Sequence, residues 1–330
     1  MKPAALAALV CGAVLAGRAA PVAHVAPIVG DTGQVTMTAT VTDAGGHPVS
    51  GLDRTDFTVI EDGVAQRIAE FDAARVPLSI GILIDASRSM AGARMLAVRG
   101  SLARLLTDRL DPRDEVFVGR FDTQPSIVQP WTDDRRAAAA SLESIDPDGG
   151  TALYDAVAQA LALARRGTRR RRVLLVVSDG GDTSSRTPLA DLQRDVRASD
   201  VQIDALAIEA FAGVKMPKSN EARPAPSPFP GLAGGATRPA AEPSAGDARP
   251  HVDAGVLRSL TDDTGGRTIV IDSARDLDAA IADLAAEFSR QYVFDVVSSR
   301  PRDGAWHMLE TRVQRGVGLI VRARRGYIAG

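Results

Sequence analysis

The sequence VPLSIGILIDASRSM, residues 76–90, decides the fold because an apolar strand in it ends abruptly in polar side chains. The run Leu78–Ile84 has the aliphatic composition of a strand buried on both faces, which is typical of parallel sheets. Asp85, Ser87 and Ser89 then follow at every second position. On these residues alone the simpler interpretation is a helix cap, because Asp and Ser bind the free backbone N–H groups where a helix begins. The alternative is one half of a binding site.

Short aliphatic runs continue to alternate with helical periodicity as far as about residue 208. This alternation predicts an α/β fold with a doubly wound, mostly parallel sheet. The segment SIVQPWT, residues 126–132, is predicted as an antiparallel edge strand, because Pro130 cannot donate to a central ladder. A later helix, DLDAAIADLAAEFSR, closes the domain. The predicted parallel strands are LSIGILI, EVFVGRF, VLLVVS and VQIDALAI, and the predicted helices span 93–110, 133–144, 152–166 and 187–198.

Two flanking segments have the composition of antiparallel strands. In VTMTATV, residues 35–41, apolar and threonine side chains alternate strictly, which predicts a half-buried strand. DFTVIEDGVAQRIAEF predicts a hairpin with its turn at residues 61–63, and the C-terminal tail returns to strand composition. Each segment has too few strands to close a core alone. We therefore predict that residues 33–75 and 291–330 form one small, discontinuous β-sandwich-like module.

Residues 212–250 differ from everything around them, because they are dense in Pro, Gly, Ala and Ser and show no period. This composition predicts a flexible insert. The predicted organisation is a signal peptide at 1–20, β segments at 33–75 and 291–330, and an α/β domain over 76–290 that carries the insert.

The N-terminal segment has the pattern of an export signal. One basic residue precedes an apolar stretch at 4–15 that is short for a membrane span, and small residues follow at 19–20. We predict that residues 1–20 are a secretory signal peptide, so that the protein is periplasmic, on the cell surface or secreted. A lipoprotein signal ending at Cys11 is the alternative, which the large Val10 disfavours. No second long apolar run is present, so we expect no membrane span in the mature chain.

Charge limits the partners of the chain. Among 330 residues, 39 Lys and Arg against 41 Asp and Glu leave a formal net charge of −2, which provides no general attraction to nucleic acid or an anionic membrane. A cluster of arginines at residues 165–172 has no aromatic side chains for base stacking. We interpret it as a helix end that leads into a buried strand. No nucleic-acid partner is expected.

Two further stretches supply oxygen-bearing side chains like those of DASRS. Thr151 follows a glycine pair in PDGGTALYDA at a predicted helix start, and Asp179 follows the buried strand in VLLVVSDGGDTSS. Ligands of open α/β sheets bind at the carboxyl ends of the strands where the strand order reverses, so these side chains are expected to converge. Oxygen ligands without nitrogen or sulfur favour Mg²⁺, Mn²⁺ or Ca²⁺ over zinc. Two carboxylates and three neutral hydroxyls leave such an ion able to accept an external carboxylate.

DASRS, the threonine of GGTALYDA and the aspartate of VVSDGGD resemble the metal-ion-dependent adhesion site of von Willebrand factor type A domains. The resemblance covers the α/β domain, and three elements in the right order make it specific. It implies that Ser87 and Ser89 coordinate the metal directly, and that Thr151 joins them when a ligand is bound. Asp85 and Asp179 often act through bound water in such sites. With its flanking β segments the chain is also similar to bacterial von Willebrand type A-related proteins.

The function implied by this resemblance is cation-dependent binding of a protein that presents an Asp or Glu carboxylate, and not catalysis. The alternative is a metal-dependent, phosphoesterase-like hydrolase that uses the same carboxylates. Phosphatases of the haloacid dehalogenase type attack through the first Asp of a DxD pair, whose second position is Ser87 here. The four histidines, His24, His47, His251 and His307, are too scattered to form a zinc set or an obvious general base.

Four other residues lie near the predicted site in the sequence. Asp122 and Asp182 are placed on the same rim and are interpreted as solvated loop carboxylates. Asp155 is interpreted as a first-turn helix residue. Ser178, beside Asp179 but outside the motif, is expected to matter much less than Asp85.

Overall fold

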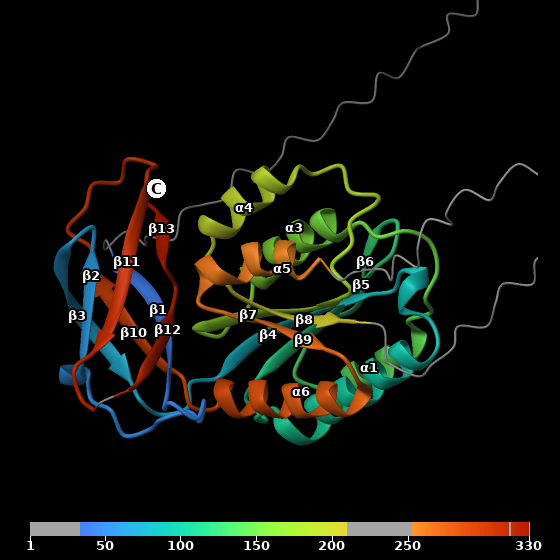
Figure 1. Ribbon diagram of the computed structural model, residues 1–330, viewed down its shortest axis with the longest axis horizontal. Coiled ribbons are helices and arrows are strands. Elements are labelled where there is room, and N and C mark those ends of the chain that lie inside the picture. The colour runs from blue at the N-terminus through green and yellow to red at the C-terminus, as the bar shows by residue number, and fades with distance from the viewer. Residues whose placement is uncertain (1–33, 210–252, 317, 330) are drawn as a thin grey trace, which may run out of the picture.

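The computed structural model describes residues 34–209, 253–316 and 318–329, which form two sheets packed side by side (Figure 1). The predicted signal peptide at 1–20 and the predicted insert at 212–250 lie outside the described residues. Within the described part of the chain, no helix is both long and apolar enough to cross a membrane.

The larger unit is built on a six-stranded sheet with the strand order β6-β5-β4-β7-β8-β9. Five strands are parallel, and β6 pairs antiparallel with β5 at the edge, as the proline predicts. The α/β class is therefore confirmed, and the sheet is mixed because β6 is antiparallel. The strands are β4 (Leu78–Asp85), β5 (Glu115–Phe121), β6 (Pro125–Thr132), β7 (Arg171–Ser178), β8 (Gln202–Ile208) and β9 (Thr268–Ile271).

Helices cover both faces of this sheet (Figure 1). On one face α1, α2 and α6 pack on strand residues such as Ile80 and Ile82, and on the other face α3, α4 and α5 pack on residues such as Leu83 and Leu174. Ser273 caps α6 by accepting a hydrogen bond from the backbone N–H of Asp276. The helices are α1 (Ala93–Arg104), α2 (Arg135–Ser141), α3 (Leu153–Ala164), α4 (Leu189–Arg197), α5 (Ala254–Thr261) and α6 (Ala274–Phe288).

The smaller unit is one seven-stranded antiparallel sheet in the order β12-β1-β10-β3-β2-β11-β13. Strands from both ends of the described chain are mixed in this sheet, since the C-terminal strand β10 lies between the N-terminal strands β1 and β3. Apolar residues of β1 such as Val35 and Met37 line its core, as the alternation in VTMTATV predicts. The strands are β1 (Gln34–Thr42), β2 (Phe57–Glu61), β3 (Val64–Asp72), β10 (Tyr292–Val297), β11 (Trp306–Val313), β12 (Ile320–Ala323) and β13 (Gly326–Ile328).

The arrangement of this sheet differs from the sandwich-like module expected from the sequence. Its two edge strands, β12 and β13, are separated in the chain only by Arg324 and Arg325. Because a two-residue link joins opposite edges, the single sheet has to curl until these edges approach each other. We call it the curled sheet below.

The curled sheet packs against the amino ends of the parallel strands. Arg170, one residue before β7, forms ion pairs with Asp72 at 2.5 Å and Asp295 at 2.9 Å. Arg171 is buried and donates to the carbonyl oxygen of Phe288 at 2.7 Å and to the side chain of Gln291. Arg170 of the basic cluster therefore links the two sheets, and Arg171 links β7 to the end of α6 and to the segment before β10; the helix-end interpretation did not include these contacts.

Candidate functional site at the carboxyl ends of the strands

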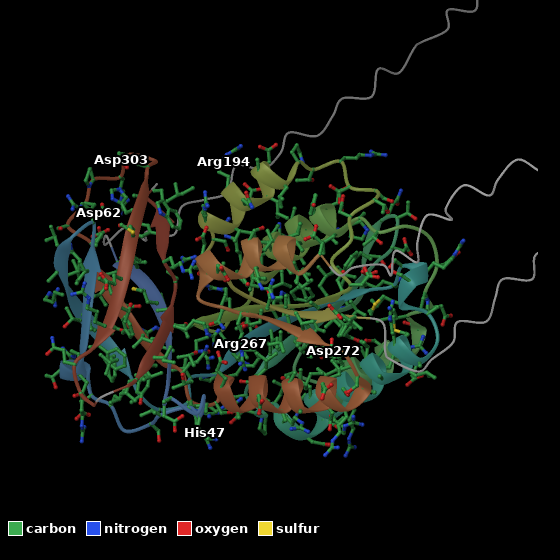
Figure 2. All side chains as sticks on the ribbon, viewed as in Figure 1. His47, Asp62, Arg194, Arg267, Asp272 and Asp303 are labelled. Carbon is green, nitrogen blue, oxygen red and sulfur yellow. The ribbon has the colours of Figure 1, made fainter. Side chains whose placement is uncertain are left out.

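The candidate site lies at the carboxyl ends of the parallel strands, which face away from the curled sheet. Figure 2 labels Arg267 just before β9 and Asp272 just after it, at the amino and carboxyl ends of that strand. The first strand of the unit, β4, lies between β5 and β7. The chain passes one face through α1 to reach β5 and passes the other face through α3 to reach β7. The strand order therefore reverses beside β4, and this is the position where open α/β sheets bind ligands.

Asp85 ends β4 and is 0% exposed. Its Oδ1 accepts a hydrogen bond of 2.8 Å from the backbone N–H of Ser87, and its Oδ2 accepts one of 2.6 Å from the hydroxyl of Ser178. Burial raises the pKa of Asp85 to about 6. The hydrogen bonds from Ser178 and Ser87 oppose this shift, and the charge of Asp179 adds to it. The two predicted carboxylates are thus close enough to interact.

Ser87 and Ser89 face each other across the turn after β4. Their hydroxyl oxygens lie 3.0 Å apart. Neither side chain caps a helix: α1 begins after Gly92 without a side-chain cap, and the 3₁₀ turn that follows Ser87 lacks one as well. The helix-cap interpretation of these two serines is therefore wrong.

Thr151 is brought to the same edge by backbone hydrogen bonds between loops. The carbonyl oxygen of Ala86 accepts from the N–H of Asp148 at 2.8 Å, and that of Asp122 accepts from the N–H of Ala152 at 2.7 Å. On the other side, the N–H of Thr183 donates to the carbonyl oxygen of Thr151 at 2.8 Å. Within the described part of the chain, no residue bonds to the hydroxyl of Thr151, which leaves this oxygen available to a ligand.

Asp179 follows the last residue of β7 in a loop that requires glycine. Gly180 adopts φ 81°, and a Cβ there would lie 2.9 Å from the backbone oxygen of Asp253. The Oδ1 of Asp179 accepts a hydrogen bond of 3.4 Å from Gly181, and its side chain is only partly buried. The loop therefore places one buried carboxylate, Asp85, beside one that reaches the surface.

Neighbouring carboxylates stabilise the loops around the site. Asp182 accepts from the hydroxyl of Ser185 at 2.6 Å, and Asp122 forms an ion pair of 3.4 Å with Arg120. Asp155 accepts hydrogen bonds from the backbone N–H groups of residues 186 and 187 at 3.0 and 2.8 Å. Its pKa is lowered because these bonds outweigh its burial. Asp155 thus anchors a loop, which its interpretation as a helix residue missed.

Ser178 is the site residue that sequence reasoning missed. The sequence predicts only that it matters much less than Asp85, whereas in the structure its hydroxyl donates to Asp85 and accepts from the N–H of Gly180 at 3.0 Å. Ser178 places a hydroxyl at the end of a buried strand, as Ser87 and Ser89 do just after β4. This pattern could have indicated a site residue. Its partner Asp85 cannot be predicted without knowing that β4 and β7 are neighbouring strands.

The donor set fits a hard cation by its chemistry. Within the described residues, no group of three or more His, Cys, Asp or Glu side chains is found that could hold a metal. The candidate set is of another kind, with two carboxylates and three hydroxyls that supply only oxygen. Hard cations such as Mg²⁺ and Ca²⁺ prefer oxygen ligands. Each carboxylate oxygen of Asp85 can accept a second interaction beyond its present hydrogen bond.

Comparison with known proteins identifies this unit. Residues 80–181 match the family model of the von Willebrand factor type A domain. The matched segment runs from β4 to the loop after β7 and contains all five candidate residues. The chain therefore carries a von Willebrand factor type A domain, as the sequence motifs predict.

Among curated proteins, the chain is similar to the inter-alpha-trypsin inhibitor heavy chain H4. The human protein is 28% identical over 134 residues, which are 37% of this chain and 14% of that protein. The protein from Sus scrofa is 27% identical over 139 residues, again 37% of this chain and 14% of that protein. The chain thus spans only a small part of the length of these relatives.

Solved structures with a similar fold include a von Willebrand factor type A protein from Catenulispora acidiphila. It is 13% identical and has a TM-score of 0.49, and the match covers 89% of this chain and 74% of that chain. The conserved hypothetical protein BatB from Bacteroides thetaiotaomicron is 20% identical with a TM-score of 0.43, over 64% of this chain and 98% of that chain.

Proposed function

We propose that the protein binds a divalent cation through Asp85, Ser87, Ser89, Thr151 and Asp179. Mg²⁺ is the first expectation, with Mn²⁺ and Ca²⁺ as alternatives. The observation that carries the proposal is the serine pair, whose hydroxyl oxygens lie 3.0 Å apart beside a buried carboxylate and cap no helix. Paired oxygens at the carboxyl edge of an α/β sheet suit a hard cation.

The proposed activity is capture of a partner protein by an Asp or Glu side chain. Two carboxylates balance the charge of a divalent cation only if both bind it fully, and three hydroxyls add no charge, so a bound ion can offer an open position to an external carboxylate oxygen. The chain's own residues prepare this position. Ser178 and the N–H of Ser87 hold Asp85, while the loops of Thr151 and Asp179 are tied to each other and to β4.

We also propose that the protein acts outside the cytoplasm. The support is the signal-peptide pattern at residues 1–20. N-terminal sequencing of protein isolated from envelope fractions and medium tests this, and the expected result is loss of about twenty residues. A chain that keeps Met1 contradicts export through this signal, whereas a mature chain that begins with a lipidated Cys11 contradicts only cleavage near residue 20.

The hydrolase alternative is less well supported by the geometry. A nucleophilic carboxylate has to reach its substrate, and Asp85 is 0% exposed with both oxygens hydrogen-bonded. His47 and His307, the two histidines within the described residues, lie at or in the curled sheet, at the far edge from the site. A phosphoesterase and peptidase screen on the purified protein discriminates the two functions, and we expect no activity.

Calorimetric titration of Mg²⁺ and Mn²⁺ tests the metal site directly. Asp85→Asn keeps the shape of the side chain and removes its charge, so we expect cation affinity to fall by about 10- to 100-fold. Asp133→Ala is the matched control, since Asp133 is an exposed carboxylate in the segment between β6 and α2. Its affinity for the cations should equal that of the wild type.

A pull-down from envelope extract, with and without a chelator, tests capture of the partner. The expected result is a partner that is retained by the wild type and by Asp133→Ala, and that is lost on chelation and with Asp85→Asn. Absence of cation binding by the wild type contradicts the metal site. Cation binding with capture that survives chelation contradicts only the capture mechanism.

A further inference from the structure

A separate cavity lies at the amino ends of the parallel strands, where the von Willebrand factor type A domain faces the curled sheet. It has a volume of about 360 Å³ and lies between α5 and β9 on one side and β11 and β12 on the other. Arg267, labelled in Figure 2, marks its position next to β9. The cavity is within the size range of small-molecule sites.

The lining of this cavity is strongly basic. It contains five arginines, Arg258, Arg267, Arg322, Arg324 and Arg325, against two carboxylates, Asp262 and Glu310. Glu310 is engaged elsewhere, because its Oε1 accepts from Arg312 at 2.6 Å. Within the described residues, neither Arg258 nor Arg324 forms an ion pair with a carboxylate. Arg267 and Arg322 pair with Glu287, and Arg325 pairs with Asp262 at 3.7 Å. The positive charge that favours a bound anion is therefore that of Arg258 and Arg324.

Arg324 provides evidence that is independent of the charge count. It is only 5% exposed, and its Nη2 donates to the carbonyl oxygen of Ser199. Its Nε and Nη1 are buried and have no hydrogen-bond partner among the described residues, and the same holds for Arg267 Nε and Thr311 Oγ1. Burial lowers the pKa of Arg324 to about 10, so the side chain is still a cation at neutral pH. Unsatisfied donors on a buried cation are costly, and an anion in the cavity that Arg324 lines would stabilise its charge.

We propose that this cavity binds the phosphoryl group of a small, soluble molecule. Guanidinium groups bind phosphate oxygens in pairs, with charge assistance. The arginines approach from α5, from the segment before β9, and from β12 and the link after it. A tetrahedral phosphoryl group presents oxygens in several directions and can therefore accept from these elements together, whereas a carboxylate has only two oxygens. The proposal does not depend on the metal site.

Calorimetry on the purified full chain, at constant ionic strength, tests this site with inorganic phosphate and glycerol 3-phosphate as probes. Both are expected to bind, while acetate and chloride are not. Arg258→Ala and Arg325→Ala change exposed arginines of the lining and should each weaken phosphate binding by about tenfold. Arg136→Ala, an exposed arginine of α2 outside the cavity, is the matched control and should bind as the wild type does.

Three results would overturn the proposal. The first is no binding of either phosphoryl probe, and the second is equal binding by the wild type and both lining variants. The third is binding to vesicles that contain phosphatidic acid without binding of the soluble probes, because that result indicates a membrane surface. Asp85→Asn should bind phosphate as tightly as the wild type, so failure of this proposal and failure of the metal site are distinguishable.

Discussion

Ser178 determines the environment of Asp85 because adjacent strands end at the same edge of the sheet. Its hydroxyl donates to Asp85 Oδ2 at 2.6 Å, whereas the other oxygen is held by the backbone of Ser87. The Ser178 bond favours the ionised carboxylate, in opposition to the burial that raises the pKa of Asp85. A side chain outside the adhesion-site motif thus helps to keep a residue of that motif charged.

Replacing Ser178 should therefore weaken cation binding. Ser178→Ala removes a hydrogen bond to a buried carboxylate, and we expect Mg²⁺ affinity to fall by about tenfold. Ser178→Thr keeps the hydroxyl and should bind close to the wild-type level. Calorimetric titration measures both variants, and equal affinities for Ser178→Ala and the wild type would show that Asp85 needs no such support.

His307 is a second residue whose charge depends on its neighbours. Its Nδ1 lies 2.7 Å from Asp62 and its Nε2 lies 3.2 Å from Asp303, so the buried ring bridges two carboxylates of the curled sheet. Burial alone would lower the pKa of His307, but the hydrogen bonds to Asp62 and Asp303 outweigh it and raise the pKa above 6.5. The hydrogen bond to His307 is the main cause that lowers the pKa of Asp62, whereas the pKa of Asp303 is lowered mainly by the backbone N–H of Ala305 and further by His307.

The stability of the protein should fall as the pH rises through the pKa of folded His307. A raised histidine pKa stabilises the fold fully below pH 6.5, the value given for the unperturbed side chain, and this contribution is lost above the folded pKa. We expect the melting temperature to drop over this range. Thermal unfolding of the wild type and His307→Gln measures it. A variant with the same pH profile as the wild type would exclude His307 as the cause.

At the scale of the elements, β4 depends on close packing with its neighbour. A Cβ at Gly81 would lie 2.3 Å from Cζ of Phe117, a side chain of β5 that is fully buried. Gly81 thus lets the aromatic ring of one strand cover the backbone of the next. This contact lies four residues before Asp85 on the same strand, so it also affects the position of the site.

Gly81→Ala should destabilise the fold by about 1–3 kcal/mol, the typical cost of an overpacked core. Gly100→Ala is the control, because its Cβ in α1 would meet only Arg104 Nη1 at 3.7 Å. Alanine should stabilise that helix by about 0.5–1 kcal/mol. Urea unfolding of both variants gives the free energies, and a Gly81→Ala protein as stable as the wild type would show that Phe117 can move aside.

Sequence patterns predicted the elements well where the pattern is local. EVFVGRF became β5 with the predicted bounds, and the antiparallel edge strand followed from Pro130. The curl of the smaller sheet was not predictable, because it depends on a two-residue link between opposite edges. The five candidate site residues were predicted from their types and order, whereas the bond of Ser178 to Asp85 was not predicted, because these two residues lie 93 positions apart in the chain. Periodicity does not specify which strands become neighbours.

At the scale of the whole molecule, the two proposed sites lie at opposite ends of the parallel strands. The eight residues of β4 span about 25 Å at the usual rise of a strand. The curled sheet packs at the amino ends, where Arg322 reaches Glu287 of α6 and Arg325 N donates to the carbonyl oxygen of Asp263 at 3.1 Å. Within the described residues, the curled sheet contributes no side chain to the candidate metal site. It can therefore carry a second ligand without blocking the first.

We propose that residues 33–75 and 291–330 fold as one module, and truncation tests this. A chain ended at Arg290 lacks both strands that pair with β1, since its neighbours are β10 and β12. We expect the amides of Val35–Val41 to lose their protection from hydrogen exchange, because the β2–β3 hairpin alone is too small to be stable.

A chain ended at Arg315 is the matched control for this truncation. It lacks β12 and β13 but keeps β10, which pairs with β1 from Gln34 to Ala39. Backbone hydrogen bonds from β10 should preserve protection over these residues, while Thr40 to Thr42, which pair with β12, exchange faster. Protected amides throughout β1 in the chain ended at Arg290 would mean that the N-terminal segment folds alone. In that case β1 would not need its pairing with β10 in order to fold.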